Sequence, residues 1–307
     1  MAGIVLSLIP VFALIALGVF LRRLELLARE GWAALERLTY FVLFPPVLFM
    51  SVAGGSFGGG EALRLGLALG CAVIALSALM ILVRPLLPIS GAQFSSVFQA
   101  GIRWNSYVAL GVISGLHGKE GIALSAVAFA VMVPLNNLFS VLVLSRYASH
   151  TPAPMSRVVR TVATNPLIIA TLLGGLVAAS GVQLPKPAAD TLTLLGQATV
   201  SIGLLCVGAA LDFGSMRSAR VAMTVGALFR VVVMPAIALG LCLLLGVGPL
   251  GLSIAMICVS SPVATSAYIL ARQLGGDATL MANLTTLTTL LSLLMMPAAI
   301  LVAHAVS

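Results

Sequence analysis

The chain has 307 residues, of which 61% are hydrophobic and 8% are charged, and its mean hydropathy is +1.18. A soluble domain cannot bury this much apolar side chain, so the composition excludes a soluble globular protein. The net charge of +8 would suggest nucleic-acid binding in a soluble protein, but in a membrane protein it is more often an excess of basic residues in cytoplasmic loops.

Apolar segments of about 20 residues follow one another along the chain, which is the length that a helix needs to cross about 30 Å of hydrocarbon. Short connections rich in Gly, Pro, Ser or charged residues separate them. The sequence therefore predicts an all-α polytopic membrane protein, embedded in a lipid bilayer, with about ten transmembrane helices. The expected spans are residues 3–21, 32–53, 62–83, 92–115, 121–144, 159–180, 188–211, 219–246, 249–272 and 279–303.

The first segment differs from a signal peptide because its basic residues, Arg22 and Arg23, come after the apolar stretch. Arginines gather in one set of alternate loops, whereas the other set receives Arg64, Lys119 and Lys186. By the positive-inside rule, this asymmetry places the N-terminus and the C-terminus outside and requires an even number of crossings. It also removes the nucleic-acid interpretation of the charge.

The two halves of the chain share a repeated pattern. The same offset of 156 positions separates Pro10 from Pro166, Gly18 from Gly174 and Arg64 from Arg220. Each half would hold five crossings, and an odd number means that the second half enters the membrane from the opposite side, as in many secondary transporters. The expected units are a five-helix repeat over residues 1–147, a short cytoplasmic linker over residues 148–158 and an inverted five-helix repeat over residues 159–307.

The fourth segment, residues 92–115, carries a charge near its middle. Arg103 would lie close to the bilayer centre, where a charge costs roughly 2.5 kcal/mol or more, so it should face a partner or a water-filled cavity. Gly101, Asn105 and Ser106 surround it, and such residues suit a locally unwound helix that exposes backbone groups to a cavity. The alternative is a structural arginine, held by helix carbonyls or by an acid on a neighbouring helix.

The fifth segment also combines a helix-loosening residue with polar side chains, because Pro134 is followed by Asn136 and Asn137. Consecutive helical residues point about 100° apart. We therefore expect one of the two amides to face a cavity and the other to face a packing partner.

The eighth and ninth segments each hold one further interruption of the apolar pattern. Arg230 lies in the middle of the eighth segment without polar company, which favours a structural role. In the ninth, Pro262 removes one helix hydrogen bond and predicts a second break near the midplane. Ser261 and Thr265 could satisfy the carbonyls that this break frees, or could contact a solute.

Titratable side chains are sparse inside the expected spans. The eight acids all lie near a membrane boundary, the three histidines lie at segment ends, and the four cysteines lie in apolar segments without C-x-x-C spacing. Paired aspartates for proteolysis, a set of metal ligands and a nucleotide-binding loop are all missing from the pattern. We therefore expect no enzyme, no metal site and no cofactor, and a carrier with an electropositive site near the midplane remains.

Two stretches resemble the auxin efflux carrier family, in particular its bacterial members, which lack the long central loop of the plant carriers. "SPVATSAYILARQLGGDATLMANLTTLTTLLSLLMMP" (residues 261–297) is similar to the last two helices of that family, and "AGIRWNSYVALGVISGLHGKEGIALSAVAFAVMVPLNNLFS" (residues 100–140) is similar to its fourth and fifth helices. The chain departs from the family pattern twice. Trp104 separates Arg103 from Asn105, and "GVISG" stands where the family has Gly-Leu-Pro after the asparagine.

This resemblance implies two inverted five-helix repeats whose broken fourth and ninth helices cross at the substrate site of an alternating-access carrier. Family substrates are organic anions, such as auxin-like monocarboxylates and malate- or malonate-like dicarboxylates. By position, Asn105 and either Asn136 or Asn137 would contact the solute carboxylate, and Pro262 would mark the partner break. The resemblance also implies a multi-pass protein of the bacterial inner membrane, and carriers of this kind commonly form symmetric homodimers.

The resulting hypothesis is a secondary carrier for small organic anions, in which Arg103 supplies a positive field. The candidate substrate-binding residues are Arg103, Asn105, Ser106, Asn136, Asn137, Ser261, Pro262 and Thr265, and the candidate helix-break residues are Gly101 and Pro262. Two alternatives stay open. One is a sodium-coupled symporter for larger, bile-acid-like organic acids, and the other is a non-transporting membrane sensor or scaffold in which Arg103 pins helices together.

Overall fold

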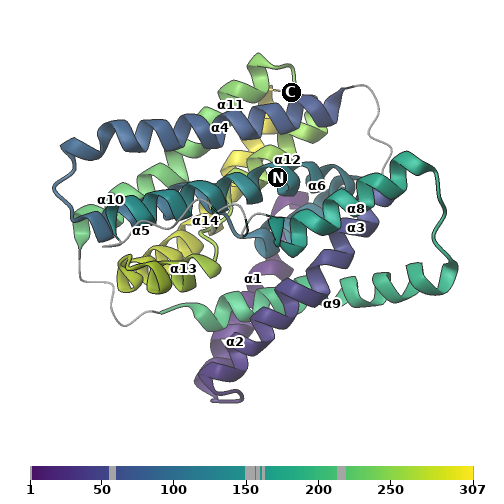
Figure 1. Cartoon of the computed structure of the whole chain (residues 1–307), viewed down its shortest axis with the longest axis horizontal. Helices are drawn as coiled ribbons and strands as arrows, with labels where there is room; N and C mark the ends of the chain where they lie inside the picture. The colour runs from purple at the N-terminus through teal and green to yellow at the C-terminus, as the bar shows by residue number, and fades with distance from the viewer. Residues whose placement is uncertain are drawn as a thin grey trace.

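The computed structural model of the chain describes residues 2–54, 60–148, 156, 160, 163–212 and 219–306. Apart from an isolated antiparallel bridge between Trp104 and Val263, the regular secondary structure of these residues is helical. In chain order (Figure 1) the helices are α1 (Ala2–Arg23), α2 (Arg29–Leu38), η1 (Thr39–Leu43), α3 (Phe44–Ala53), α4 (Glu61–Val83), η2 (Arg84–Leu86), α5 (Gly91–Ile102), α6 (Ser106–Tyr147), α8 (Pro166–Ser180), α9 (Lys186–Ala210), α10 (Arg220–Leu228), η3 (Phe229–Val233), α11 (Met234–Leu244), α12 (Pro249–Ser260), α13 (Ser266–Leu274) and α14 (Ala278–Val306).

Seven helical stretches among the described residues are long and apolar enough to cross a membrane, and α8 and α12 are shorter apolar helices. The prediction of an all-helical polytopic membrane protein is therefore confirmed. The number of ten crossings stays a prediction, because interruptions divide several of the expected spans into shorter helices. Of the linker expected over residues 148–158, all but Ala148 and Ser156 lie outside the described residues.

Two of the helical passages run through a short π-helical turn beside proline. The turn η1 joins α2 to α3, whose first turn contains Pro45 and Pro46. The turn η3 joins α10 to α11, whose second residue is Pro235. A proline has no backbone N–H, so the hydrogen-bond ladder shifts beside it, and a single wider turn accommodates the shift. These turns hold Tyr40 and Arg230, two residues of the site described below.

The long helix α6 changes direction at Gly118, whose backbone angles of φ 53° and ψ −142° lie outside the helical region. At about 1.5 Å per residue, a straight helix of this length would be about 60 Å long, twice the thickness of the hydrocarbon core. Glycine adopts a positive φ without the steric penalty of a Cβ atom. Gly118 therefore divides α6 into two arms, at a point between the expected segments 92–115 and 121–144.

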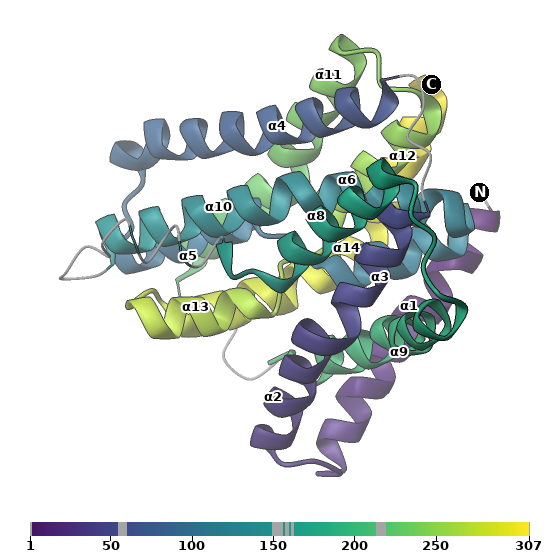
Figure 2. The same ribbon diagram turned by 45° about the vertical axis from the view of Figure 1, so that its right-hand side comes forward.

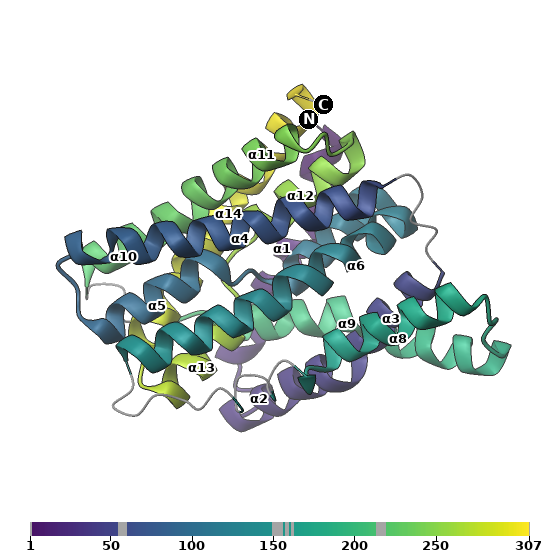
Figure 3. The same cartoon turned by 45° about the horizontal axis from the view of Figure 1, so that its top comes forward.

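The helices form two groups that meet along α6 (Figures 1 and 2). A side group contains α1, α2, α3, α8 and α9, in which α1 packs on α9 and α3 packs on both α8 and α9. A crossing group contains α4, α5, α6 and α10 to α14. Contacts of α6 with α1, α3, α8 and α9 join the two groups. Figure 3 shows α2, α3, α8 and α9 along one edge of the molecule and α4, α10 and α11 along the opposite edge.

Candidate functional site

Two interrupted helices cross at the centre of the crossing group. The residues that connect α5 to α6 run antiparallel to those that connect α12 to α13. The Asn105 N–H donates a 2.8 Å hydrogen bond to the Pro262 carbonyl, and Trp104 forms the bridge with Val263. Backbone hydrogen bonds between the two breaks therefore replace part of the helical bonding that each break lacks.

The first break forms without a proline. Helix α5 continues through Gly101 and ends one residue later, and the backbone of Arg103 is extended (φ −83°, ψ 119°). Asn105 then begins α6 as its N-cap, and its Oδ1 accepts hydrogen bonds from the N–H groups of Tyr107 (3.1 Å) and Val108 (3.2 Å). An asparagine at this position satisfies backbone donors that the start of a helix leaves free, so the cap stabilises the break.

The second break contains Pro262. Ser261, at the end of α12, is extended (φ −65°, ψ 153°), because the ring of a following proline disfavours the helical conformation. The Ser261 hydroxyl donates a 2.9 Å hydrogen bond to the carbonyl of Cys258. The serine therefore satisfies a carbonyl at the helix end, which is one of the two roles that the sequence left open.

Arg230 holds the ends of both interrupted helices together. It is 1% exposed, and it donates hydrogen bonds from Nε to the Ser261 carbonyl (2.8 Å), from Nη1 to the Gly101 carbonyl (3.3 Å) and from Nη2 to the Cys258 carbonyl (3.1 Å). These carbonyls belong to the C-terminal ends of α5 and α12, where the helix dipole is negative and intrahelical donors run out. Arg230 thus has the structural role expected for it, with carbonyls as its partners.

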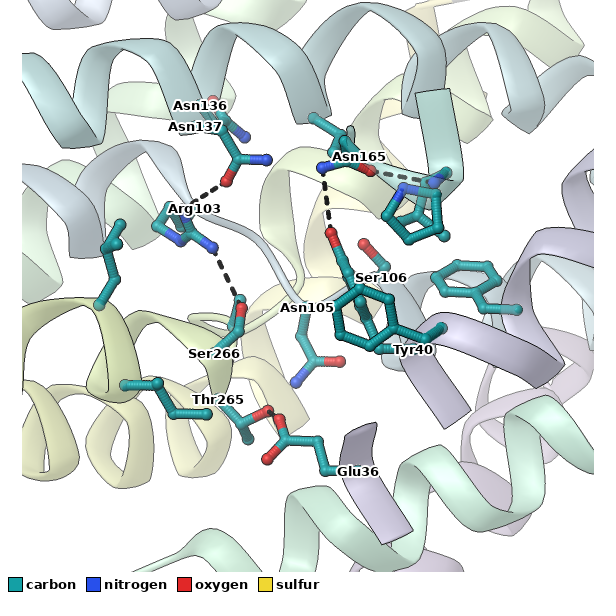
Figure 4. Close-up of a pocket in the computed structure, with 18 of the residues that line it drawn as sticks. Glu36, Tyr40, Arg103, Asn105, Ser106, Asn136, Asn137, Asn165, Thr265 and Ser266 are labelled. Atoms are coloured by element: carbon teal, nitrogen blue, oxygen red, sulfur yellow. Dashed lines mark hydrogen bonds between the residues drawn. The ribbon is translucent and has the colours of Figure 1, made fainter. Parts of the chain in front are cut away.

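A cavity of about 430 Å³ lies beside this crossing, between the side group and the crossing group (Figure 4). Its volume falls within the range of small-molecule sites, about 300–1,000 Å³. The polar and charged side chains that line it are Glu36, Arg37, Tyr40, Arg103, Asn105, Ser106, Tyr107, Asn136, Asn137, Thr164, Asn165, Thr265, Ser266 and Gln273. Aromatic and aliphatic side chains, including Phe44 and Leu270, complete the wall, so the cavity suits an organic solute with polar groups.

Arg103 reaches this cavity from the first break. Its Nη1 donates a 2.8 Å hydrogen bond to Oδ1 of Asn137, and its Nη2 donates a 3.1 Å hydrogen bond to Oγ of Ser266 (Figure 4). Among the described residues, the ion pair within 4 Å is the exposed pair Lys186–Asp190. No described carboxylate therefore contacts the Arg103 guanidinium, and neutral groups hold it in place.

Asn136 and Asn137 both line the cavity, whereas we expected one of them to face a cavity and the other a packing partner. Asn137 is held by Arg103, whereas Oδ1 of the buried Asn136 lacks a hydrogen-bond partner. Nδ2 of Asn105 is also buried and unpartnered. Buried polar atoms usually have partners, so these two amides leave an acceptor and a donor for a solute.

The remaining candidate residues divide into two sets. Ser106 and Thr265 line the cavity, each at or next to the start of the helix that follows a break. Ser261 and Pro262 do not line it, and the Pro262 carbonyl instead accepts the backbone hydrogen bond of the crossing. The structure therefore brings the predicted residues of α6 and α13 together and leaves those at the end of α12 outside the cavity.

Glu36 is a cavity residue that the sequence reasoning missed. Glu36 lies within Arg29–Ala53, a stretch apolar enough to cross a membrane, and it lines the cavity. Its Oε1 accepts a 2.6 Å hydrogen bond from the Thr265 hydroxyl. The sequence does contain a feature that could have identified it, because Glu36 is the sole acid within the expected span 32–53.

Tyr40 and Asn165 are two further cavity residues that the sequence did not single out. Nδ2 of Asn165 donates a 3.1 Å hydrogen bond to the Tyr40 hydroxyl, and its Oδ1 accepts a 3.0 Å hydrogen bond from the N–H of Leu167. Asn165 is thus the N-cap of α8, which starts with Pro166. An Asn-Pro pair at the start of a helix is a recognisable capping signal, but it gives no sign of what the asparagine faces.

Comparison with known families matches the second half of the chain. A family model described as membrane transport protein matches residues 142–300, just over half of the chain. No curated protein matches it significantly. The matched range contains Arg230 and the break between α12 and α13, whereas Arg103 and Asn105 precede it.

Proposed function

The chain belongs to the membrane transport protein family, which is the auxin efflux carrier family, and we propose that it is a secondary carrier that moves small organic anions by alternating access. The proposed solutes are auxin-like monocarboxylates or malate- and malonate-like dicarboxylates. Members of this family are membrane transporters rather than enzymes. From the same resemblance, we propose a multi-pass homodimer in the inner membrane of a bacterium.

The environment of Arg103 is the observation that carries this proposal. Its guanidinium lines a cavity and is held by Asn137 and Ser266, which are neutral, and its Nε is buried without a partner. A guanidinium binds a carboxylate through two parallel charge-assisted hydrogen bonds, which are stronger than bonds to neutral groups. A carboxylate that entered the cavity would therefore replace weaker contacts with stronger ones.

The interrupted helices add to this positive field. The N-cap residues of α6 and α13 are Asn105 and Thr265, and both line the cavity. The C-terminal ends of α5 and α12 are bonded to Arg230 instead. Because a helix carries partial positive charge at its N-terminus and partial negative charge at its C-terminus, the attractive ends face the cavity and the repulsive ends are neutralised.

The arrangement of the two helix groups supports alternating access. Helix α1 packs on α9 while α8 packs on α3, and each half of the chain contributes one interrupted helix to the crossing. Two inverted five-helix repeats, over residues 1–147 and 159–307, would produce such matching contacts, in which the first helix of each half packs on the second helix of the other half. We therefore propose ten crossings with both termini outside, which agrees with the position of both chain ends at one edge in Figure 3. The crossing group would move against the side group.

Flux measurements test the proposal. Purified protein in sealed proteoliposomes should take up labelled indole-3-acetate, malate or malonate. Arg103→Gln should reduce this uptake at least about tenfold, because a hydrogen bond to a charged group contributes about 1.5–3 kcal/mol. Arg29→Gln is the matched control, since Arg29 is an exposed arginine at the start of α2 outside the cavity lining.

Other outcomes select the alternatives. Uptake that requires a sodium gradient would support the sodium-coupled organic-acid symporter. Folded protein that gives no flux with any of these anions contradicts the proposed organic-anion solutes, and no flux with any solute favours a sensor or scaffold.

A further inference from the structure

The cavity lining includes one acidic side chain, Glu36, in addition to the arginines Arg37 and Arg103. Glu36 comes from α2 in the side group, lines the cavity and accepts the 2.6 Å hydrogen bond from Thr265. Figure 4 shows its carboxyl group beside Thr265, while Arg103 lies beside Ser266. The adjacent residues Thr265 and Ser266 thus hold an acid on one side and a base on the other.

This acidic side chain and this basic side chain share a cavity without pairing. Among the described residues, no ion pair joins Glu36 to Arg103 or to the neighbouring Arg37. Tyr107 of α6 and Cys206 of α9 also lie within electrostatic range of Glu36, and neither is a cation. Opposite charges attract strongly away from bulk water, and buried charges are normally paired. A solute that lay between them could complete both pairs at once.

The space between Glu36 and Arg103 has the chemistry for such a solute. Oδ1 of Asn136 and Nδ2 of Asn105 are unpartnered, which adds one acceptor and one donor. Tyr40, Phe44 and Tyr107 contribute aromatic surface to the same cavity. The lining therefore suits a small molecule that has an apolar part and two charged groups.

We infer that the transported solute carries a cationic nitrogen as well as a carboxylate, as an amino-acid-type zwitterion does. Its carboxylate binds Arg103, its ammonium group binds Glu36, and its apolar side chain lies against the aromatic wall. The inference rests on the proposed carrier function but changes the proposed solute from an organic anion to a zwitterion, whose carboxylate is the group that Arg103 recognises.

The test uses two sets of three ligands that differ in one charged group. Phenylalanine is compared with 3-phenylpropionate, which lacks the ammonium group, and with 2-phenylethylamine, which lacks the carboxylate. Leucine, 4-methylpentanoate and 3-methylbutylamine form the smaller set. Dissociation constants are measured by calorimetry, and thermal stability is recorded in parallel, on the full chain in detergent.

Wild type should bind one of the amino acids at least about tenfold more tightly than either partial analogue. Glu36→Gln keeps an oxygen that can accept from Thr265 but loses the charge, so it should remove the preference for the amino acid over the acid without the ammonium group. Glu30→Gln, an exposed change in the same helix, should keep that preference.

Several results would overturn the inference. If 3-phenylpropionate or 4-methylpentanoate binds wild type as tightly as its amino acid, the solute is a simple anion and the carrier proposal stands alone. If binding of such an acid depends on pH in wild type but not in Glu36→Gln, Glu36 is a proton site instead. If no member of either set binds but malonate or malate does, the zwitterionic solute is excluded and the proposed carrier function remains. If malonate and malate also fail to bind, the zwitterionic solute and the carrier function are both contradicted.

Discussion

The backbone N–H of Asn105 donates a 2.8 Å hydrogen bond to the carbonyl of Pro262, and this bond joins the two helix breaks of the chain. The same asparagine caps α6 with its side chain. One residue therefore ends the unwound segment, starts the next helix and fastens it to the opposite break. The crossing is expected to behave as one unit, because neither break can change its backbone without affecting the other.

The cap can be separated from the crossing by changing the side chain of Asn105. Asn105→Ala should lower the free energy of unfolding by about 1 kcal/mol, since the N–H groups of Tyr107 and Val108 lose their acceptor. Asn105→Asp should restore the stability, because a carboxylate accepts the same bonds, but should weaken anion binding by adding negative charge to the cavity. Thermal unfolding in detergent measures the first effect, and an alanine variant as stable as wild type would contradict it.

Arg230 should matter for folding more than for binding. Arg230→Met removes the donor to the carbonyls of Gly101 and Ser261 and one of the two side-chain donors to the carbonyl of Cys258, and we expect a loss of about 3 kcal/mol or more in the free energy of unfolding. Arg230→Lys should recover part of the loss, because one ammonium group cannot replace the planar fork. Thermal unfolding and the folded fraction on size exclusion report the effect. Arg29→Met is the surface control, and equal stability of the two methionine variants would refute the role given to Arg230.

Asn137 offers a way to neutralise Arg103 without removing it. Asn137→Asp places a carboxylate at the position that now accepts the 2.8 Å hydrogen bond from Nη1. The new pair should occupy the guanidinium and reduce the affinity for a carboxylate solute at least about tenfold, with little loss of stability. Asn137→Ala leaves the charge of Arg103 free and should bind better than the aspartate variant. Calorimetric titration decides, and the reverse order of affinities would contradict the assignment of Arg103 to the solute.

The contact between α1 and α9 depends on glycine. A Cβ atom added at Gly208 would lie 3.0 Å from Cα of Gly18 and against the backbone carbonyl of Ile15. Gly208→Ala should therefore destabilise the protein by about 1–3 kcal/mol, because rigid backbone cannot move aside. In α11, a Cβ added at Gly240 meets nothing within 4 Å, so Gly240→Ala should be neutral or slightly stabilising. Thermal unfolding curves of the two alanine variants are compared. Similar shifts in their melting temperatures would contradict the prediction, because they would show that α1 and α9 can move apart at little cost in free energy.

The sequence by itself determined the features that depend on local composition. Apolar runs of helical length established a polytopic helical membrane protein, and the charge of Arg103 inside such a run placed it at a polar site. Pro262 identified one break, because a missing N–H interrupts a helix whatever surrounds it. The polar pair Asn136 and Asn137 identified part of the cavity wall on α6.

The tertiary structure alone decided which of these groups meet. The first break has no proline and depends on the Asn105 cap and on a backbone bond to Pro262, a residue far away in the chain. In the sequence, Glu36 is an acid close to the start of an expected span. Packing of the side group against the crossing group places it beside Thr265. The physical reason is that periodicity and composition record how each helix meets lipid or protein on average, whereas hydrogen bonds between distant residues depend on how the helices pack.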